Sequence, residues 1–150
     1  MDRTDLLTLR LLAENGRMTW TELAQHLSLS APAAAERVRR LEERGYVRGY
    51  GAVLDRETTG YGLTAFVSVD LVNAGKRTAF LALVDEHPEV MECHHVAGDH
   101  DYLLKIASRD TRDLDRFLNE VLKAGNLVSR TRTTIVLGSP KESLFAPPES

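Results

Sequence analysis

The chain has 150 residues, of which 43% are hydrophobic and 27% are charged, and its formal net charge is −3. This composition is typical of a globular protein, and no apolar run approaches the roughly 18 residues of a membrane-spanning helix. The first ten residues, MDRTDLLTLR, lack the basic start of a signal peptide, and a single cysteine, Cys93, excludes an internal disulfide. These features predict a cytoplasmic protein without a membrane partner.

The distribution of charge is more informative than its sum. Every lysine or arginine before position 57 is an arginine, and five arginines fall between positions 37 and 48. Arginine favours bidentate contacts with phosphate and guanine. A solvated helix face has the same composition, so the cluster by itself leaves DNA binding and a plain exposed helix equally open.

Two helices are predicted in the first 27 residues. Leucines at helical spacing indicate the first helix, which Asn15 and Gly16 should end. Thr19 and Glu22 have the spacing of a capping box, in which each side chain accepts a backbone N–H of the other residue. A second helix is therefore expected to begin there and to run to about Leu27.

A third helix follows after a short turn. Ser30 is its natural N-cap, Pro32 is tolerated in its first turn, and Gly45 should end it. Two short helices joined by a turn of three to four residues form a helix-turn-helix unit. Ser28 stands in this turn where glycine is usual, so its backbone must either avoid the left-handed conformation or bear some strain.

Helical periodicity divides the third helix into two faces. Ala34, Val38 and Leu41 share one face, which we expect to be buried. The opposite face would enter the major groove of DNA. The alternative is a solvated helix in a small bundle.

The outward face offers chemistry suited to base edges. A methyl can contact thymine (Ala33), a carboxylate can accept from cytosine N4 (Glu36), and a guanidinium can reach guanine or phosphate (Arg40). Arg37 lies at the margin and suits a phosphate. The candidate DNA-binding residues are Ser30, Pro32, Ala33, Glu36, Arg37, Arg39, Arg40 and Arg48.

The pattern changes from helical to β-like after residue 45, which predicts a linker strand up to about residue 54 and then a polar linker. The remaining expected elements are strand 63–72, helix 75–87, strand 89–97, strand 102–108, helix 111–124 and strand 127–137. The order β-α-β-β-α-β is that of a ferredoxin-like unit, an antiparallel sheet covered by two helices. Phe66, Val67 and Val69 alternate with polar neighbours, so the uncovered face is expected to bind a partner, most simply in a homodimer.

The sequence thus predicts an α+β protein. The expected domains are a helix-turn-helix DNA-binding domain with its linker strand (1–56), a linker (57–62), a βαββαβ domain (63–143) and a loose tail (144–150).

Four stretches of this chain together resemble the Lrp/AsnC family of leucine-responsive and feast/famine regulators. They are Leu23-Ala24 with Leu29-Ser30, the run ERVRRLE at 36–42, the run GYVRGY at 45–50 with Ala52, and the run VAGDHDYLL at 96–104. The resemblance covers essentially the whole chain. It implies a winged-type helix-turn-helix of three helices joined by a linker strand to a ferredoxin-like domain.

The same resemblance implies a transcription regulator that binds double-stranded DNA and forms homodimers, which assemble into homo-octamers. A small effector, commonly an amino acid, would bind between dimers. The family places it near a loop and a strand that match Gly98, Asp99, His100, Asp101, Thr131 and Thr133 here.

The chemistry of this loop fits an amino acid. Backbone N–H groups at a glycine turn can hold a carboxylate, and Asp99 or Asp101 can hold an ammonium. The loop can equally be a plain hairpin turn in which both aspartates cap backbone amides.

Two departures from the family pattern matter. Ala97 replaces a frequent threonine, which leaves the effector open, and the small Ala33 and Ala34 indicate reading partly through DNA shape.

Other functions have to be weighed. Cys93, His94, His95 and His100 suggest a metal site, but neighbouring residues of a strand point to opposite faces, so at most three of them converge. We expect no metal and no cofactor. One alternative is an enzyme, since sirohaem decarboxylases resemble this architecture and bind a tetrapyrrole through histidines. The other alternative is a ligand-binding regulatory subunit, which would have no affinity for DNA. The arginine-bearing helix favours a regulator without catalytic residues, and salt-dependent DNA affinity would separate it from both alternatives.

Overall fold

The structure is a computed structural model that describes residues 1–142. The chain divides into two compact units between Val53 and Leu54, close to the predicted boundary at residue 56. The predicted tail, 144–150, lies outside the described residues. No helix in the described part is long and apolar enough to span a membrane.

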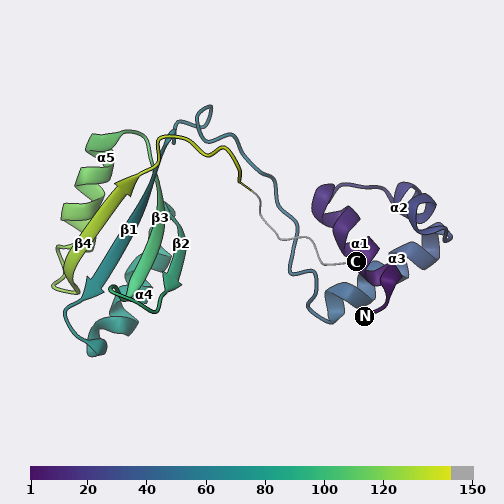
Figure 1. The fold of residues 1–150 in the computed structure, drawn as a ribbon, viewed down its shortest axis with the longest axis horizontal. Helices are drawn as coiled ribbons and strands as arrows, with labels where there is room; N and C mark the ends of the chain where they lie inside the picture. Colours follow the sequence, from purple (N-terminus) through teal and green to yellow (C-terminus); the bar gives the residue numbers. More distant parts are fainter. Residues whose placement is uncertain (143–150) are drawn as a thin grey trace. The chain divides into compact units, whose positions relative to one another are not determined.

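Three helices make up the N-terminal unit (Figure 1). They are α1 (Arg3–Glu14), α2 (Trp20–Leu27) and α3 (Ala31–Glu43). The predicted capping box of α2 is confirmed, because Thr19 accepts from the backbone N–H of Glu22 and Glu22 accepts from that of Thr19. Their core consists of Leu12, Leu23, Ala24, Leu27, Ala34 and Val38.

The turn between α2 and α3 resolves the alternatives at Ser28. Its φ of 54° and ψ of 43° are left-handed, so this serine does adopt the conformation that glycine would take more easily. Gly45, with a φ of 74°, ends α3 as predicted. The N–H of Tyr46 donates to the carbonyl of Leu41 and that of Gly45 to the carbonyl of Glu42, which is the Schellman arrangement.

The predicted linker strand is wrong for the chain by itself. Between α3 and the first strand, all of which the structure describes, no residue is in a β-strand. A strand needs a hydrogen-bonded neighbour, and the chain supplies none here. Val53 and Leu54 are accordingly exposed, by 78% and 67%.

The C-terminal unit has the predicted βαββαβ order (Figure 1). Its elements are β1 (Leu63–Leu71), a 3₁₀ turn (Ala74–Lys76), α4 (Arg77–Glu86), β2 (Val90–His95), β3 (Tyr102–Ser108), α5 (Thr111–Arg116), a π-helical continuation (Phe117–Leu122) and β4 (Val128–Ile135). The strand order is β2-β3-β1-β4 and every neighbouring pair is antiparallel. The ferredoxin-like prediction is confirmed.

Both helices cover one face of this sheet. Phe80 of α4 and Leu114 of α5 belong to the same core cluster as Val67 and Val69 of β1. The prediction that these two valines share the uncovered face with Phe66 is wrong, because odd and even residues of a strand point to opposite sides. Phe66, 37% exposed, is the member of the trio on the open face.

Charged side chains share the open face with Phe66. The pairing of the strands places Glu92, Lys105, Asp70, Arg130 and Arg132 on this side of the sheet. The face therefore combines apolar and charged groups, which distinguishes it from an interior core.

Candidate DNA-binding face and effector loop

The predicted division of α3 into a buried and an exposed face is confirmed. Ala34 and Val38 are fully buried and Leu41 is 2% exposed, so this side anchors α3 to the other helices. The opposite face is exposed along its whole length, with Ala33 and Arg40 on it. The N-terminal cap is in place as well, because the Ser30 hydroxyl accepts from the backbone N–H of Ala33 at 3.3 Å.

Arg39 is engaged within its own helix. Its Nε lies 2.9 Å from Oε2 of Glu36 and its Nη2 lies 2.7 Å from Oε1 of the same carboxylate, while Nη1 bonds Glu43. The Arg39 guanidinium holds the pKa of Glu36 below its usual range. All three side chains are about half exposed, and ion pairs of this kind contribute little to stability and break readily.

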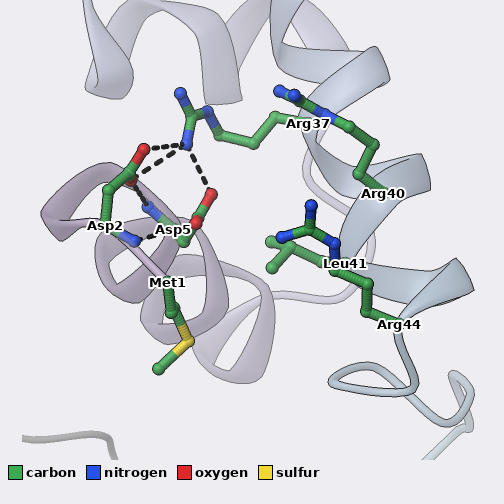
Figure 2. A pocket seen from close by; sticks show the side chains of 7 residues that line it. All are labelled: Met1, Asp2, Asp5, Arg37, Arg40, Leu41 and Arg44. Carbon is green, nitrogen blue, oxygen red and sulfur yellow. Dashed lines mark hydrogen bonds and ion pairs between the residues drawn. The ribbon is translucent and has the colours of Figure 1, made fainter.

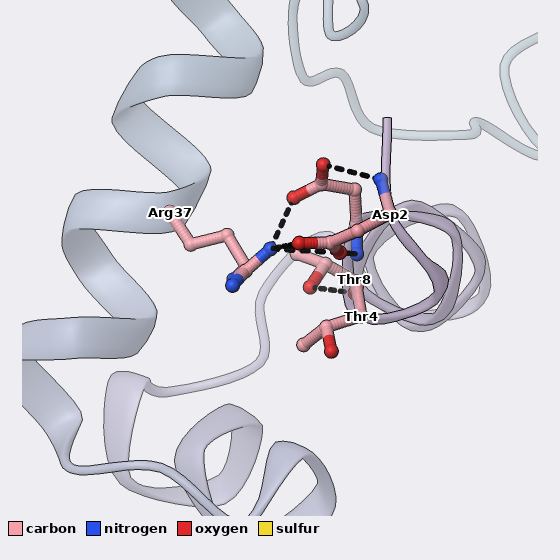
Figure 3. A network of polar contacts seen from close by, with 5 residues as sticks. Asp2, Thr4, Thr8 and Arg37 are labelled. Carbon is pink, nitrogen blue, oxygen red and sulfur yellow. Dashed lines mark hydrogen bonds and ion pairs between the residues drawn. The ribbon is translucent and has the colours of Figure 1, made fainter.

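Arg37 does not extend freely from the margin of α3. Its Nη1 lies 2.9 Å from both carboxylate oxygens of Asp2 and 2.5 Å from Oδ1 of Asp5, so it joins α3 to the start of α1 (Figure 3). The Arg37 side chain is only 18% exposed. A phosphate would have to compete with two carboxylates for this guanidinium, which argues against the role that the sequence suggested for it.

The two aspartates are themselves fixed by a capping box at the start of α1. Asp2 accepts from the backbone N–H of Asp5 at 2.7 Å, and Asp5 accepts from that of Asp2 at 3.0 Å. The Arg37 guanidinium lowers the pKa of Asp2; the backbone N–H of Asp2, followed by Arg37, lowers the pKa of Asp5. In the sequence, the only signal for this cluster is the spacing of the two aspartates, which fits a capping box and was not used above.

A hollow of about 340 Å³ lies beside this cluster, between the start of α1 and the flank of α3 (Figure 2). Arg37 and Arg40 of α3 and Arg44, the residue that follows α3, line it at positions about one helical turn apart. Within residues 1–142, neither Arg40 nor Arg44 has a hydrogen-bond or ion-pair partner. Arg48 is also exposed and unpaired in that range.

The predicted effector loop is a tight connection between β2 and β3. Gly98 has a φ of +147°, a conformation that side chains disfavour, although a Cβ there would meet no atom within 4 Å. Asp101 caps the end of β1, since its N–H donates to the Val69 carbonyl and its Oδ2 accepts from the Leu71 N–H at 2.8 Å. Asp101 therefore has the turn-capping role of the alternative interpretation, whereas Asp99 is exposed without a partner in the described residues.

His100 belongs to a second ion-pair cluster. Its Nδ1 lies 3.0 Å from Oδ1 of Asp70, and Nε of Arg130 lies 2.7 Å from the other oxygen of that carboxylate. Arg130 and then His100 lower the pKa of Asp70. The sequence analysis missed Asp70 and Arg130, which are separated by 60 residues and meet only because β4 pairs with β1.

The two threonines of β4 lie at different distances from the loop along the strand. Thr131 is opposite Val69, the residue whose carbonyl accepts from the Asp101 N–H, so it lies near the loop. Thr133 is opposite Val67, farther along β1. Both share the helix-covered side with these valines, whereas the His100–Asp70 pair lies on the open side.

A second hollow, of about 310 Å³, adjoins Asp101 and contains residues that the sequence analysis did not propose. Arg77, His95 and Tyr102 line it together with Asp101. Arg77 is exposed and unpaired in the described chain. Tyr102 is 2% exposed and packs between Phe80 and His95 at ring distances of 4.9 and 5.2 Å. Its hydroxyl has no hydrogen-bond partner among residues 1–142.

The cysteine and histidines of β2 do not converge on one point. Cys93 and His95 share the helix-covered side, and His94 lies on the other side, 3.0 Å from Glu92. Burial raises the pKa of the Cys93 thiol. Among residues 1–142, no three cysteine, histidine or acidic side chains are grouped so that they could hold a metal ion.

Comparison with known sequences agrees with this architecture. Residues 1–48 match a sequence model described as winged helix-turn-helix DNA-binding, and residues 64–144 match one described as the Lrp/AsnC ligand binding domain. The matches define a helix-turn-helix regulator with a separate ligand-binding unit. The chain belongs to the Lrp/AsnC family of transcription regulators.

Named relatives and solved structures support the same family. The Bkd operon transcriptional regulator of Pseudomonas aeruginosa is 42% identical over 127 residues, 81% of each chain. A transcriptional regulator of Neisseria meningitidis, solved in complex with L-Met, has a TM-score of 0.94 at 34% identity and covers 98% of this chain and 96% of its own. The feast or famine regulatory protein of Mycobacterium tuberculosis, complexed with L-methionine, has a TM-score of 0.90 at 35% identity, with 98% and 99% covered.

Proposed function

We propose that the exposed face of α3 enters the major groove of double-stranded DNA and reads an operator. The observation that carries this proposal is the contrast across α3, whose Val38 side is fully buried while its Ala33 and Arg40 side is open to solvent. The proposed contacts to DNA come from Ser30, Pro32, Ala33, Glu36, Arg39, Arg40 and Arg48.

The mutual pairing of Glu36 and Arg39 gives this face a defined chemistry. In the free protein the two side chains satisfy each other. On a duplex, Arg39 can donate both bonds to a guanine and Glu36 can accept from cytosine N4, so the pair is replaced by base contacts of the same kind. Because exposed ion pairs are weak, this exchange costs little.

The test begins with recovery of bound genomic fragments, followed by titration of the operator found and of a scrambled duplex of equal length. Arg40→Ala is expected to weaken operator binding by roughly 1 to 3 kcal/mol. Arg112→Ala removes the same charge from the exposed surface of the other unit and is the matched control. Equal affinity of the unaltered protein for both duplexes would contradict the proposal.

We infer further that the effector is an amino acid bound near the Gly98–Asp101 loop. The hollow beside Asp101 supports this inference, because Arg77 offers a cation for a carboxylate and Asp101 an anion for an ammonium. Two similar structures are complexes with L-methionine, which favours the same ligand class here. Asp99, Thr131 and Thr133 are proposed to complete the surroundings, and His100, paired with Asp70 on the open side of the sheet, is proposed to hold the loop in place.

Calorimetry with a panel of amino acids tests the effector proposal. Asp101→Ala is expected to abolish the heat of binding and the effect of the amino acid on operator affinity while leaving affinity without effector unchanged. Arg112→Ala again serves as control. If Asp101→Ala binds the amino acid as the unaltered chain does, the site lies elsewhere.

Assembly into homodimers and homo-octamers is also proposed, with the effector between dimers. Exposed apolar residues support an assembly, namely Phe66 on the open sheet face and Val53 and Leu54 before β1. Light scattering across a concentration series, with and without the amino acid, measures it. We assign this chain a binding function without catalytic residues, since its named relatives are regulators.

A further inference from the structure

The hollow between α1 and α3 is a candidate binding site because two of the arginines that line it make no hydrogen bond or ion pair within the described residues. Arg40 and Arg44 line it side by side from the flank of α3, each exposed (Figure 2). Within residues 1–142, neither guanidinium makes a hydrogen bond or an ion pair. Two adjacent guanidinium groups present donors in the fork geometry that matches phosphate oxygens.

The third arginine of the hollow, Arg37, does have ion-pair partners. Arg37 is held by both Asp2 and Asp5, and each of these aspartates is fixed by the backbone N–H of the other (Figure 2). This contact ties the flank of α3 to the first turn of α1. Arg37 thus fixes the wall of the hollow instead of adding a free cation to it.

The charge balance of the hollow favours an anion on the side of Arg40 and Arg44. The two aspartates exceed Arg37 by one negative charge, and the N-terminus of α1 offsets roughly half a charge of that excess. Arg40 and Arg44 outweigh the remaining half charge, which leaves roughly +1.5 in favour of an anion. Because Arg40 also borders the exposed face of α3, an anion here would lie at the rim of any groove that this face enters.

We propose that a DNA backbone phosphate binds in this hollow through Arg44 and Arg40, and that Arg37, held by Asp2 and Asp5, is a positioning residue and not a DNA ligand. The proposal rests on the proposed reading of DNA by α3. It adds Arg44 to the DNA contacts and moves Arg37 out of them.

Salt dependence separates these roles. Each phosphate contact that is lost lowers the slope of log affinity against log salt concentration by about one. Arg44→Ala should lower the slope by about one for each subunit on the duplex, and should weaken the operator and a scrambled duplex by the same factor, roughly tenfold. Arg112→Ala, the charge-matched control, should leave the slope unchanged.

Arg37→Met should keep the slope, although its affinity and melting temperature fall because α3 is held less firmly. Arg37→Lys restores a cation that can donate to the aspartates, so it should recover part of the affinity and part of the melting temperature. A slope that falls in Arg37→Met as much as in Arg44→Ala would overturn the assignment of roles, and an unchanged slope in Arg44→Ala would overturn the phosphate site.

Duplexes with one neutral methylphosphonate at successive backbone positions identify the phosphate. At the contacted position, neutralisation should weaken the unaltered protein and should weaken Arg44→Ala less, because only the Arg40 contact is left to lose there, whereas other positions should affect both proteins equally. If no position shows this coupling, the hollow takes no DNA phosphate, even if inorganic phosphate binds there. This outcome differs from a failure of operator recognition by α3. In that case the unaltered protein would bind the operator and the scrambled duplex equally.

Discussion

The two units of the molecule each contain an ion-pair cluster that joins distant segments, and the clusters are built in opposite ways. In the N-terminal unit one cation, Arg37, lies between Asp2 and Asp5. In the C-terminal unit one anion, Asp70, lies between Arg130 and His100. The first cluster joins two helices, whereas the second joins the loop between β2 and β3 to two strands of the sheet. The first arrangement therefore fixes helix packing, and the second fixes the position of a loop.

The largest expected effect comes from breaking the first cluster. Arg37→Met removes the cation and leaves Asp5, which is mostly buried, without its side-chain partner. We expect the free energy of unfolding to fall by about 1 to 3 kcal/mol, measured by urea denaturation. Arg39→Gln is the control on the same helix, because its exposed partners remain hydrated and no measurable loss is expected. Equal losses in both variants would show that the Arg37 cluster has no special role.

Breaking the second cluster should cost less stability. Asp70→Asn keeps the size of the side chain but removes the charge that Arg130 and His100 share. A loss of about 1 kcal/mol is expected, and hydrogen exchange should increase in the loop 98–101 and leave α1 and α3 unchanged. Increased exchange in the N-terminal unit would contradict the separation of the two clusters.

The smallest expected effect is a shift in the pH at which acid unfolds the protein, caused by the loss of the first cluster. The folded-state pKa values of Asp2 and Asp5 are lowered, so their pairing stabilises the fold above their unfolded values, near 3.9, and is lost as pH falls through the folded ones. In Arg37→Met both values are lowered less, and the midpoint of acid unfolding should move to higher pH by less than about one unit. Far-ultraviolet circular dichroism against pH measures this shift, and a shift to lower pH would contradict the sign.

Features set by neighbouring residues were predictable from the sequence. The capping box of Thr19 and Glu22, the stop at Gly45 and the buried Val38 face of α3 depend on spacings of a few residues and are confirmed. The order of strands and helices followed from the change between periods of about 3.6 and 2.

Contacts between distant segments were not predictable in the same way. The partners of Arg37 lie 32 and 35 residues away, and Asp70 lies 60 residues from Arg130. Such pairs depend on how helices pack and on strand register, which periodicity does not specify. The linker strand was predicted from the change to a β-like pattern after residue 45, yet a strand also requires a neighbour, which the described chain lacks at that point.

The pairing of Arg39 with Glu36 and Glu43 has a consequence for the search along a chromosome. With these carboxylates, Arg39 adds no net positive charge to the outward face of α3, so general attraction for DNA comes mainly from Arg40 and Arg44 at its edge. A genome offers millions of wrong sites, and weak attraction to them leaves a larger share of the protein free to find the right one. On the proposed reading of DNA by α3, the pairing of Arg39 with two carboxylates therefore limits sequestration at such sites.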